Sequence, residues 1–152
     1  MLVTSLILQR LDYCNSVLAG LQASSTTVQN AAARLILNLD NRAHVTQALQ
    51  QLHWLPVHYG TQYKIATLMH HIYNNTAPTY LSNLVSFSLA RSLRSTTNRA
   101  AVQRTRTRLG DRAFSIAGPG VWNNLPASRR QTVSTAAFKR QLETYLCSVV
   151  GV

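Results

Sequence analysis

Residues 59–75 read YGTQYKIATLMHHIYNN, and their apolar pattern decides the fold class of this chain. The apolar side chains recur at helical spacing, so they share one side of a helix. They are Tyr59, Tyr63, Ile65, Leu68, Met69 and Ile72, and Asn74-Asn75 ends the pattern. We therefore expect an amphipathic helix with one buried face.

Three amphipathic patterns of the same kind precede this helix. The first ends near Gly20, the second ends at Asp40-Asn41, and the third stops before Trp54 and Pro56. Their apolar residues are Ile7, Leu11, Cys14, Leu18 and Leu21; Val28, Ala32, Leu35, Ile36 and Leu39; and Val45, Ala48, Leu49 and Leu52. The first half of the chain is therefore expected to be a series of helices.

Two further helices are expected after residue 75. Pro78 suits the first turn of a short helix that contains Leu81, Leu84 and Val85. Ser134 is a suitable N-cap for a final helix. The expected buried face of that helix consists of Phe138, Leu142, Tyr145, Leu146 and Val149.

Residues 100–117 show a different pattern. Arg104, Arg106 and Arg108 recur at every second position between threonines, which indicates an extended strand. A turn at Gly110-Asp111 would let residues 113–117 pair back with that strand. Residues 118–120, Gly-Pro-Gly, are expected to break the chain before a helical turn at Trp122 that fills a core.

Together these patterns predict a mainly α fold. We expect a compact bundle of five or six helices with a small β-hairpin near residues 100–117. A polar, basic loop at residues 86–99 is the best domain boundary. Residues 1–88 would form a helical domain, and residues 89–152 a basic segment with the hairpin and a C-terminal helix that packs back on the first part.

The composition limits the class of protein. The 152 residues suit one domain, or one domain with a basic appendage, and a hydrophobic fraction of 46% is enough for a core. Cys14 and Cys147 are far apart, which argues for two reduced thiols in an intracellular protein, nuclear or cytoplasmic. The apolar run at residues 2–8 is too short for a membrane span.

The positive charge is concentrated in the C-terminal part. Residues 1–90 contain four Lys or Arg and two acids, a net charge of +2, whereas residues 91–152 contain eleven and two, a net charge of +9. Self-repulsion of this kind does not stabilise a compact domain, so the charge points to a polyanionic partner. Nucleic acid is the commonest such partner.

The arginines at positions 104, 106 and 108 are the sharpest binding feature. On a strand they would lie about 6.8 Å apart on one side and contact successive phosphates. The expected nucleic-acid-binding residues are Arg91, Arg94, Arg99, Arg104, Arg106, Arg108, Arg112, Arg129, Arg130, Lys139 and Arg140. The alternative is a solvated basic face. Phe114, Trp122 and Tyr145 have apolar neighbours and are expected in the core rather than against bases.

Catalysis and metal binding are not expected. Two-metal phosphoryl transfer needs clustered carboxylates that hold cations about 4 Å apart, whereas Asp12, Asp40, Asp111 and Glu143 stand singly. Asp111 is expected to be a turn residue paired with an arginine. The histidines, among which His53 is expected to be a half-buried partner of a backbone group, have no second ligand at metal spacing. We expect no enzyme activity, no cofactor and no small-molecule substrate.

A series of short motifs occurs in a fixed order along the chain. They are LDYCN at 11–15, VQNAAARL at 28–35, LHWLPV at 52–57, APTYL at 77–81, GDRAFS at 110–115 and VWNNLP at 121–126, followed by Phe138-Lys139 and Leu142. The series resembles the C-terminal region of the reverse transcriptase polyprotein of non-LTR retrotransposons, the long interspersed elements. The resemblance covers nearly the whole chain.

The resemblance implies a place after the polymerase palm, where the family's catalytic aspartates lie. It also implies a thumb-like, RNA-binding role for the basic half. We therefore expect a non-catalytic nucleic-acid-binding remnant of a retroelement reverse transcriptase, with RNA favoured over DNA. The alternatives are a helical protein–protein interaction module that docks on a reverse transcriptase core, and a decayed open reading frame without a selected function.

Overall fold

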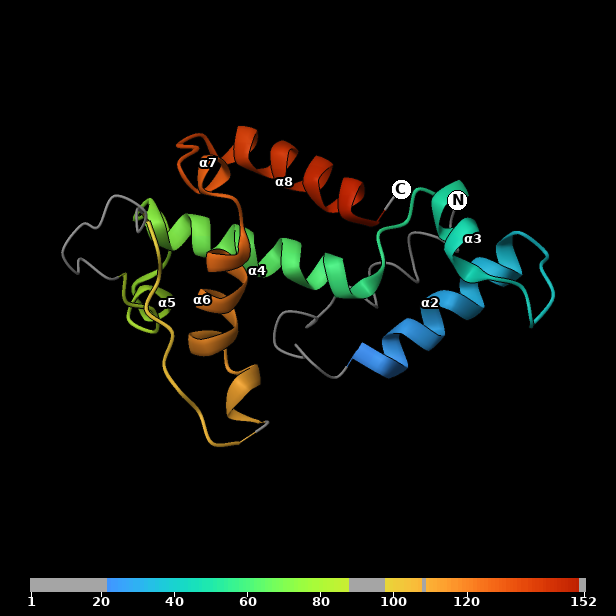
Figure 1. Cartoon of the computed structure of the whole chain (residues 1–152), viewed down its shortest axis with the longest axis horizontal. Helices are drawn as coiled ribbons and strands as arrows, with labels where there is room; N and C mark the ends of the chain where they lie inside the picture. The colour runs from blue at the N-terminus through green and yellow to red at the C-terminus, as the bar shows by residue number, and fades with distance from the viewer. Residues whose placement is uncertain (1–21, 88–97, 108, 151–152) are drawn as a thin grey trace.

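The structure is a computed structural model that describes residues 22–87, 98–107 and 109–150 (Figure 1). Mainly α is the correct fold class. The helices in these ranges are α2 (Gln22–Ile36), α3 (Val45–Gln51), α4 (Val57–Tyr73), α5 (Thr79–Ser82), the 3₁₀ helix η1 (Gly110–Arg112), α6 (Phe114–Asn124), α7 (Ala127–Arg130) and α8 (Thr135–Val150). The helix expected at residues 7–21 and the expected boundary near residue 88 lie outside the described residues.

Helix α4 is the centre of the fold. Figure 1 shows α8 above α4 and α6 crossing it, and both helices contact α4 extensively. The main core joins Ile65 and Met69 of α4, Trp122 of α6, and Phe138 and Leu142 of α8, each at most 2% exposed. Burial of each such side chain contributes roughly 1.5–3 kcal/mol, so this core holds the C-terminal part of the chain against α4.

Helix α2 buries only part of the face expected from its apolar pattern: Ala32 is 7% exposed and Ile36 is partly buried. Val28 is 50% exposed and Leu35 is 75% exposed, whereas Gln29 is only 1% exposed. Gln29 Nε2 donates to the carbonyl of Leu55 (3.0 Å), and its Oε1 accepts the backbone N–H of Val57 (3.1 Å). These bonds satisfy the first turn of α4, where Pro56 provides no side-chain cap. A long-range polar contact therefore sets the orientation of α2.

The expected β-hairpin is not formed in the described residues. Residues 101–105 form neither a helix nor a strand, and the strand-like contact of this region is one antiparallel bridge between Phe87 and Ala100, just before them. Residues 113–117 cannot act as a partner strand because they start helix α6, where the Ala117 N–H donates to the carbonyl of Ala113 (2.9 Å). The alternating residues therefore predicted a strand and a hairpin that the described residues do not form.

Gly118 and Pro119 lie inside α6 rather than between two elements. A Cβ on Gly118 would lie 2.9 Å from the sulfur of Met69, so the glycine allows α6 to approach α4 closely. Pro119 is buried at this contact. Tertiary packing therefore outweighs the local preference of Gly-Pro-Gly for a chain break, and the expected turn at Trp122 becomes the last part of a longer helix.

The final helix matches its expected start. Ser134 Oγ accepts the N–H of Ala137 (3.5 Å), as an N-cap does. Phe138, Leu142 and Leu146 are buried and Tyr145 is partly buried. Val149 is 52% exposed, so its expected burial was wrong. None of the described helices has both the length and the apolar content to cross a membrane.

Candidate nucleic-acid interface

The basic segment at residues 98–107 is attached to the core at its beginning. The indole N–H of Trp122 donates to the carbonyl of Asn98 (2.8 Å). The Ala100 N–H donates to Asn123 Oδ1 (3.0 Å), and Asn123 Nδ2 donates to the Ala100 carbonyl (2.8 Å). Ala100 itself is buried. These bonds fix the place where the segment leaves the core, and they put Arg99 between two anchored residues.

The segment ends in a second set of hydrogen bonds. The Gly110 N–H donates to Thr107 Oγ1 (3.1 Å), and the Thr105 hydroxyl donates to Asp111 Oδ1. Asp111 lies in the 3₁₀ helix η1 rather than in the expected turn, and its side-chain partner in the described structure is a threonine rather than an arginine. Arg104 and Arg106, on either side of Thr105, are exposed. Arg108, Arg91 and Arg94 lie outside the described residues.

Arg130 has a structural environment that differs from those of the other basic residues. It is 4% exposed, and its Nη1 donates to the Asn98 carbonyl (3.1 Å), the same carbonyl that accepts from Trp122. Burial lowers the pKa of the Arg130 guanidinium, and the positive charge of nearby Arg99 lowers it further. Arg130 thus fixes the start of the basic segment and has little surface to offer to a ligand.

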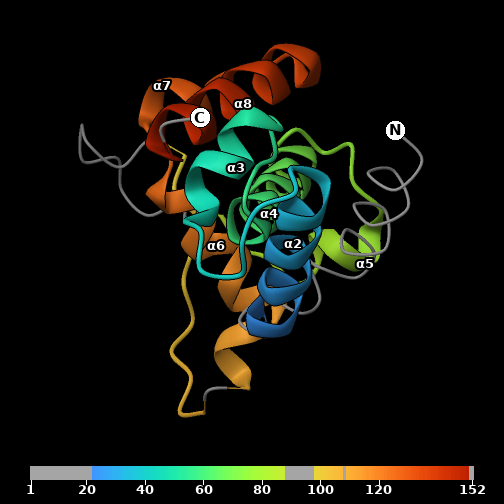
Figure 2. The ribbon, with the colours of Figure 1, turned by 90° about the vertical axis from the view of Figure 1, so that its right-hand side faces the viewer.

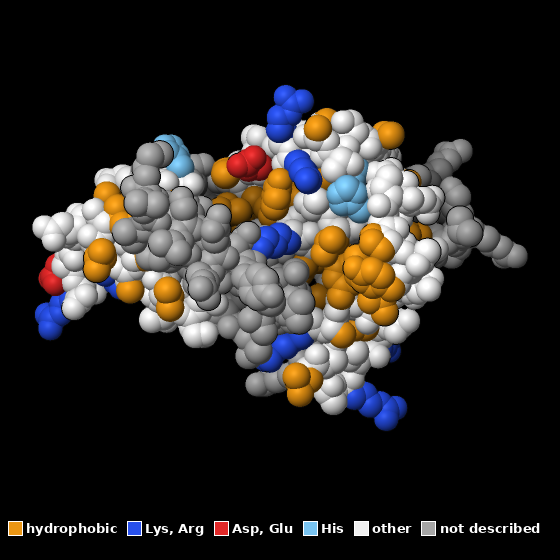
Figure 3. All heavy atoms as spheres, turned by 180° about the vertical axis from the view of Figure 1, so that it is seen from behind, with side chains coloured by type: hydrophobic (Ala, Val, Ile, Leu, Met, Phe, Trp, Pro, Cys, Tyr) orange, Lys and Arg blue, Asp and Glu red, His pale blue; other side chains and the backbone are white. Residues whose placement is uncertain are grey.

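The remaining cations lie on η1, α7 and α8. Lys139 and Arg140 are exposed on α8, and Arg112 of η1 and Arg129 of α7 are half-buried. Figures 1 and 2 share a vertical axis, and in both α8 lies at the top whereas the end of the segment 98–107 lies at the bottom. Figure 3 likewise shows the Lys and Arg side chains of the rear face as separate groups. The structure therefore divides the expected binding residues into an upper group, on α7 and α8, and a lower group, at the end of the segment 98–107.

The upper group borders a shallow hollow of about 320 Å³ between α7 and α8. Arg129, Ala137, Arg140, Gln141 and Thr144 line it. Sequence reasoning identified the two arginines but missed Gln141 and Thr144. The signal was present, since positions 137, 140, 141 and 144 share one face of a helix opposite the apolar stripe.

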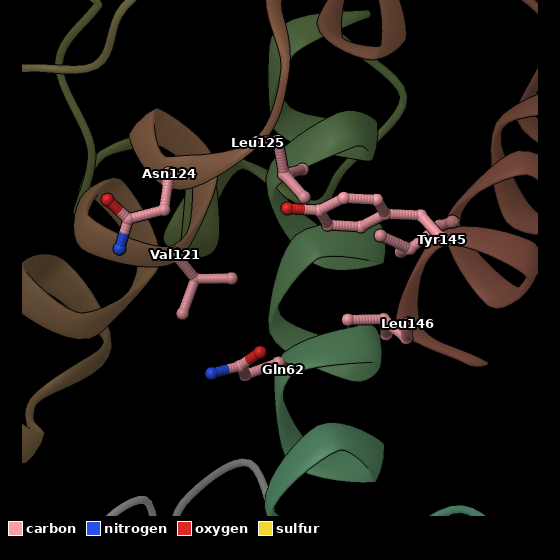
Figure 4. A pocket seen from close by; sticks show the side chains of 7 residues that line it. Gln62, Val121, Asn124, Leu125, Tyr145 and Leu146 are labelled. Carbon is pink, nitrogen blue, oxygen red and sulfur yellow. The ribbon is translucent and has the colours of Figure 1, made fainter. Parts of the chain in front are cut away.

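A second cavity, between α4, α6 and α8, is more enclosed but small, about 80 Å³ (Figure 4). Val121, Leu125 and Leu146 form its apolar wall, and Tyr145 reaches across from α8 toward α4. Sites for small organic ligands usually measure about 300–1,000 Å³. This cavity is too small for such a ligand.

The histidines do not assemble a metal site among the described residues, where no group of three potential metal ligands occurs. His53 is exposed, contrary to the half-buried position expected. His70 is fully buried: its ring lies 4.2 Å from the Phe138 ring, and Nε2–H donates to the Thr132 carbonyl (2.7 Å). Nδ1 then accepts from Asn74 Nδ2 (3.2 Å), so neutral His70 is a satisfied core residue.

The aromatic residues are in the core, as expected. Trp122 is fully buried, and Phe114 and Tyr145 are partly buried against the core. Cys147 is a free, half-buried thiol.

Comparisons of the chain with protein-family models, with curated proteins and with solved structures find no match.

Proposed function

We propose that this chain is a non-catalytic nucleic-acid-binding segment, a C-terminal remnant of a retroelement reverse transcriptase that binds RNA through arginine–phosphate contacts. The observation that carries the proposal is the net charge of +9 in residues 91–152. Within the described part of residues 91–152, the exposed cations available for contact are Arg99, Arg104, Arg106, Lys139 and Arg140. The resemblance of the motif series to the long interspersed elements supports RNA as the ligand.

The mechanism is electrostatic. A guanidinium presents a planar fork of donors that matches a phosphate, and each neutralised phosphate releases condensed counterions. The segment 98–107 suits contact with a strand because its exposed arginines follow one another along a stretch of backbone outside the helices. With about five phosphates contacted on a single strand, log affinity should fall with log salt at a slope of about −3.5.

The experiment is a salt titration of RNA binding, followed by fluorescence anisotropy of the full chain. Replacement of Arg104, Arg106 and Arg108 by alanine should reduce the magnitude of the slope by about two, because each lost phosphate contact removes about 0.7. A slope that stays at the wild-type value would reject this segment as the contact surface.

The alternative function, a helical interaction module, has one observation in its favour. Val28 and Leu35 are exposed on the same side of α2, about two turns apart, in a part of the chain with low charge. Exposed apolar side chains at such positions are typical of helices that pack against a partner. Salt-insensitive association of the chain with a polymerase core, lost in Leu35→Ser, would favour this function over RNA binding.

A further inference from the structure

We propose that the hollow between α7 and α8 binds a phosphate monoester, the terminal phosphate of a nucleic-acid strand. The choice of a strand as its source rests on the proposed function. Recognition of the phosphate itself rests on the residues that line the hollow, and these come from two helices that meet at one edge of the fold.

Arg129 is held in place before any ligand arrives. Its Nη1 donates to the carbonyl of Gln141 (2.5 Å), and its guanidinium carbon lies 4.7 Å from the centre of the Tyr145 ring. The hydrogen bond and the cation–π contact restrict a side chain that would otherwise lose rotamer entropy on binding. Its other N–H groups remain as donors at the seam of α7 and α8.

Gln141 is oriented as well. Its Oε1 accepts the hydroxyl of Thr132 (3.0 Å), which leaves the NH₂ of the carboxamide as the end that donates. Arg140, exposed on the next position of α8, adds a second guanidinium to the same hollow. The lining therefore offers two positive charges and a neutral donor.

Among the described residues that line the hollow, none is acidic. Burial raises the pKa of Tyr63 on α4, and the charge of Glu143 on α8 raises it further. A carboxylate in the hollow would repel an anion and neutralise an arginine. Its absence from this lining leaves the charge of Arg129 and Arg140 available.

The chemistry of the lining matches a phosphate monoester better than a diester. A monoester carries about 1.5–2 negative charges at neutral pH and three terminal oxygens, whereas a diester in the strand carries one charge. Two guanidiniums and one amide NH₂ complement the monoester in both charge and donor number. A volume of about 320 Å³ also exceeds the needs of a bare ion and lies at the lower end of small-ligand sites.

The test compares short single-stranded RNAs that differ only in a terminal phosphate, at the 5′ or the 3′ end, using the full chain. A strand with the preferred terminal phosphate should bind about tenfold more tightly than its hydroxyl counterpart, the effect of one charged hydrogen-bonding group. Arg140→Gln should reduce this preference to within about twofold. Equal affinity for phosphorylated and unphosphorylated strands in the wild-type chain would overturn the inference.

Lys139→Gln is the matched control, since it removes the same charge from the neighbouring exposed position of α8 outside the hollow. It should weaken all strands equally and keep the preference. Loss of the preference in Lys139→Gln as well would mean that general charge, rather than the hollow, recognises the strand end.

Competition separates the sources of the phosphate. A nucleoside monophosphate should abolish the preference at lower concentration than inorganic phosphate; equal potency would reject the strand end as the ligand. If no RNA binds, the proposed function fails, and the hollow is then judged separately by calorimetry. Inorganic phosphate and nucleoside monophosphate should still bind wild-type chain and not Arg140→Gln, and absence of both signals would overturn the site.

Discussion

Arg130→Gln separates a structural arginine from the binding arginines. The change removes the bond from Nη1 to the Asn98 carbonyl, and hydrogen bonds with a charged partner contribute about 1.5–3 kcal/mol. The desolvation cost of the buried guanidinium offsets part of this gain in the wild type. We therefore expect the free energy of unfolding to fall by about 1–2 kcal/mol, which corresponds to a Tm about 2–8 °C lower.

The assay is urea unfolding followed by tryptophan fluorescence, because Trp54 and Trp122 are both buried and become exposed on unfolding. RNA affinity is then measured under conditions in which the variant is fully folded. There, Arg130→Gln should bind almost as tightly as the wild type, since only 4% of this side chain is exposed.

Arg106→Gln is the matched comparison. Arg106 is exposed, so the unfolding free energy should change by less than about 0.5 kcal/mol while the salt slope of binding falls by about 0.7. The reasoning is refuted if Arg130→Gln leaves the urea midpoint unchanged and reduces the salt slope as Arg106→Gln does. That result would make Arg130 a phosphate contact.

Three further predictions concern stability. Gln29→Leu should reduce the free energy of unfolding by about 1–3 kcal/mol in urea, because the Leu55 carbonyl and the Val57 N–H lose their partner. Phe138→Ala should cost about 3–5 kcal/mol, measured in the same way, because it opens a cavity in the main core. Burial, partly opposed by the bond to Thr132, lowers the pKa of His70 below its usual 6.5, so the unfolding free energy should fall as pH decreases below 6.5.

The sign of the last effect follows from proton uptake. Above pH 6.5 the His70 ring is neutral in both the folded and the unfolded state. Between pH 6.5 and the lower pKa of the folded state, the unfolded chain binds a proton on this ring and the folded chain does not, so the unfolding free energy falls. A pH profile of His70→Gln as steep as that of the wild type would contradict this assignment. Gln47→Leu is the exposed control for Gln29→Leu, and Val149→Ala is the exposed control for Phe138→Ala. If a control lowers the free energy of unfolding as much as the buried substitution does, the packing argument is contradicted.

The sequence correctly predicted the helices whose apolar residues pack into the same core. The apolar pattern of residues 59–75 matches most of α4, and the pattern after Ser134 matches α8, because each helix buries a continuous face. The face of α2 was only partly correct because its orientation depends on Gln29, whose partners lie 26 and 28 residues away. No local pattern carries that information.

The same limit explains the site. Charge segregation and the exposure of Arg104 and Arg106 follow from residue types, so they could be predicted. The burial of Arg130 could not, since it depends on the carbonyl of Asn98, 32 residues away. The hairpin failed for a related reason: a strand needs a partner, and residues 113–117 gain more from packing α6 on α4 than from pairing.

These contacts connect the core to the proposed interface. Trp122 is a core residue, yet its indole N–H and the guanidinium of Arg130 both bind the Asn98 carbonyl, next to exposed Arg99. The place where the basic segment begins is therefore set by the packing of α6 and α7, and not by the arginines that would contact a strand. Because positioning and contact belong to different residues, loss of stability and loss of salt-dependent binding are separable by single substitutions.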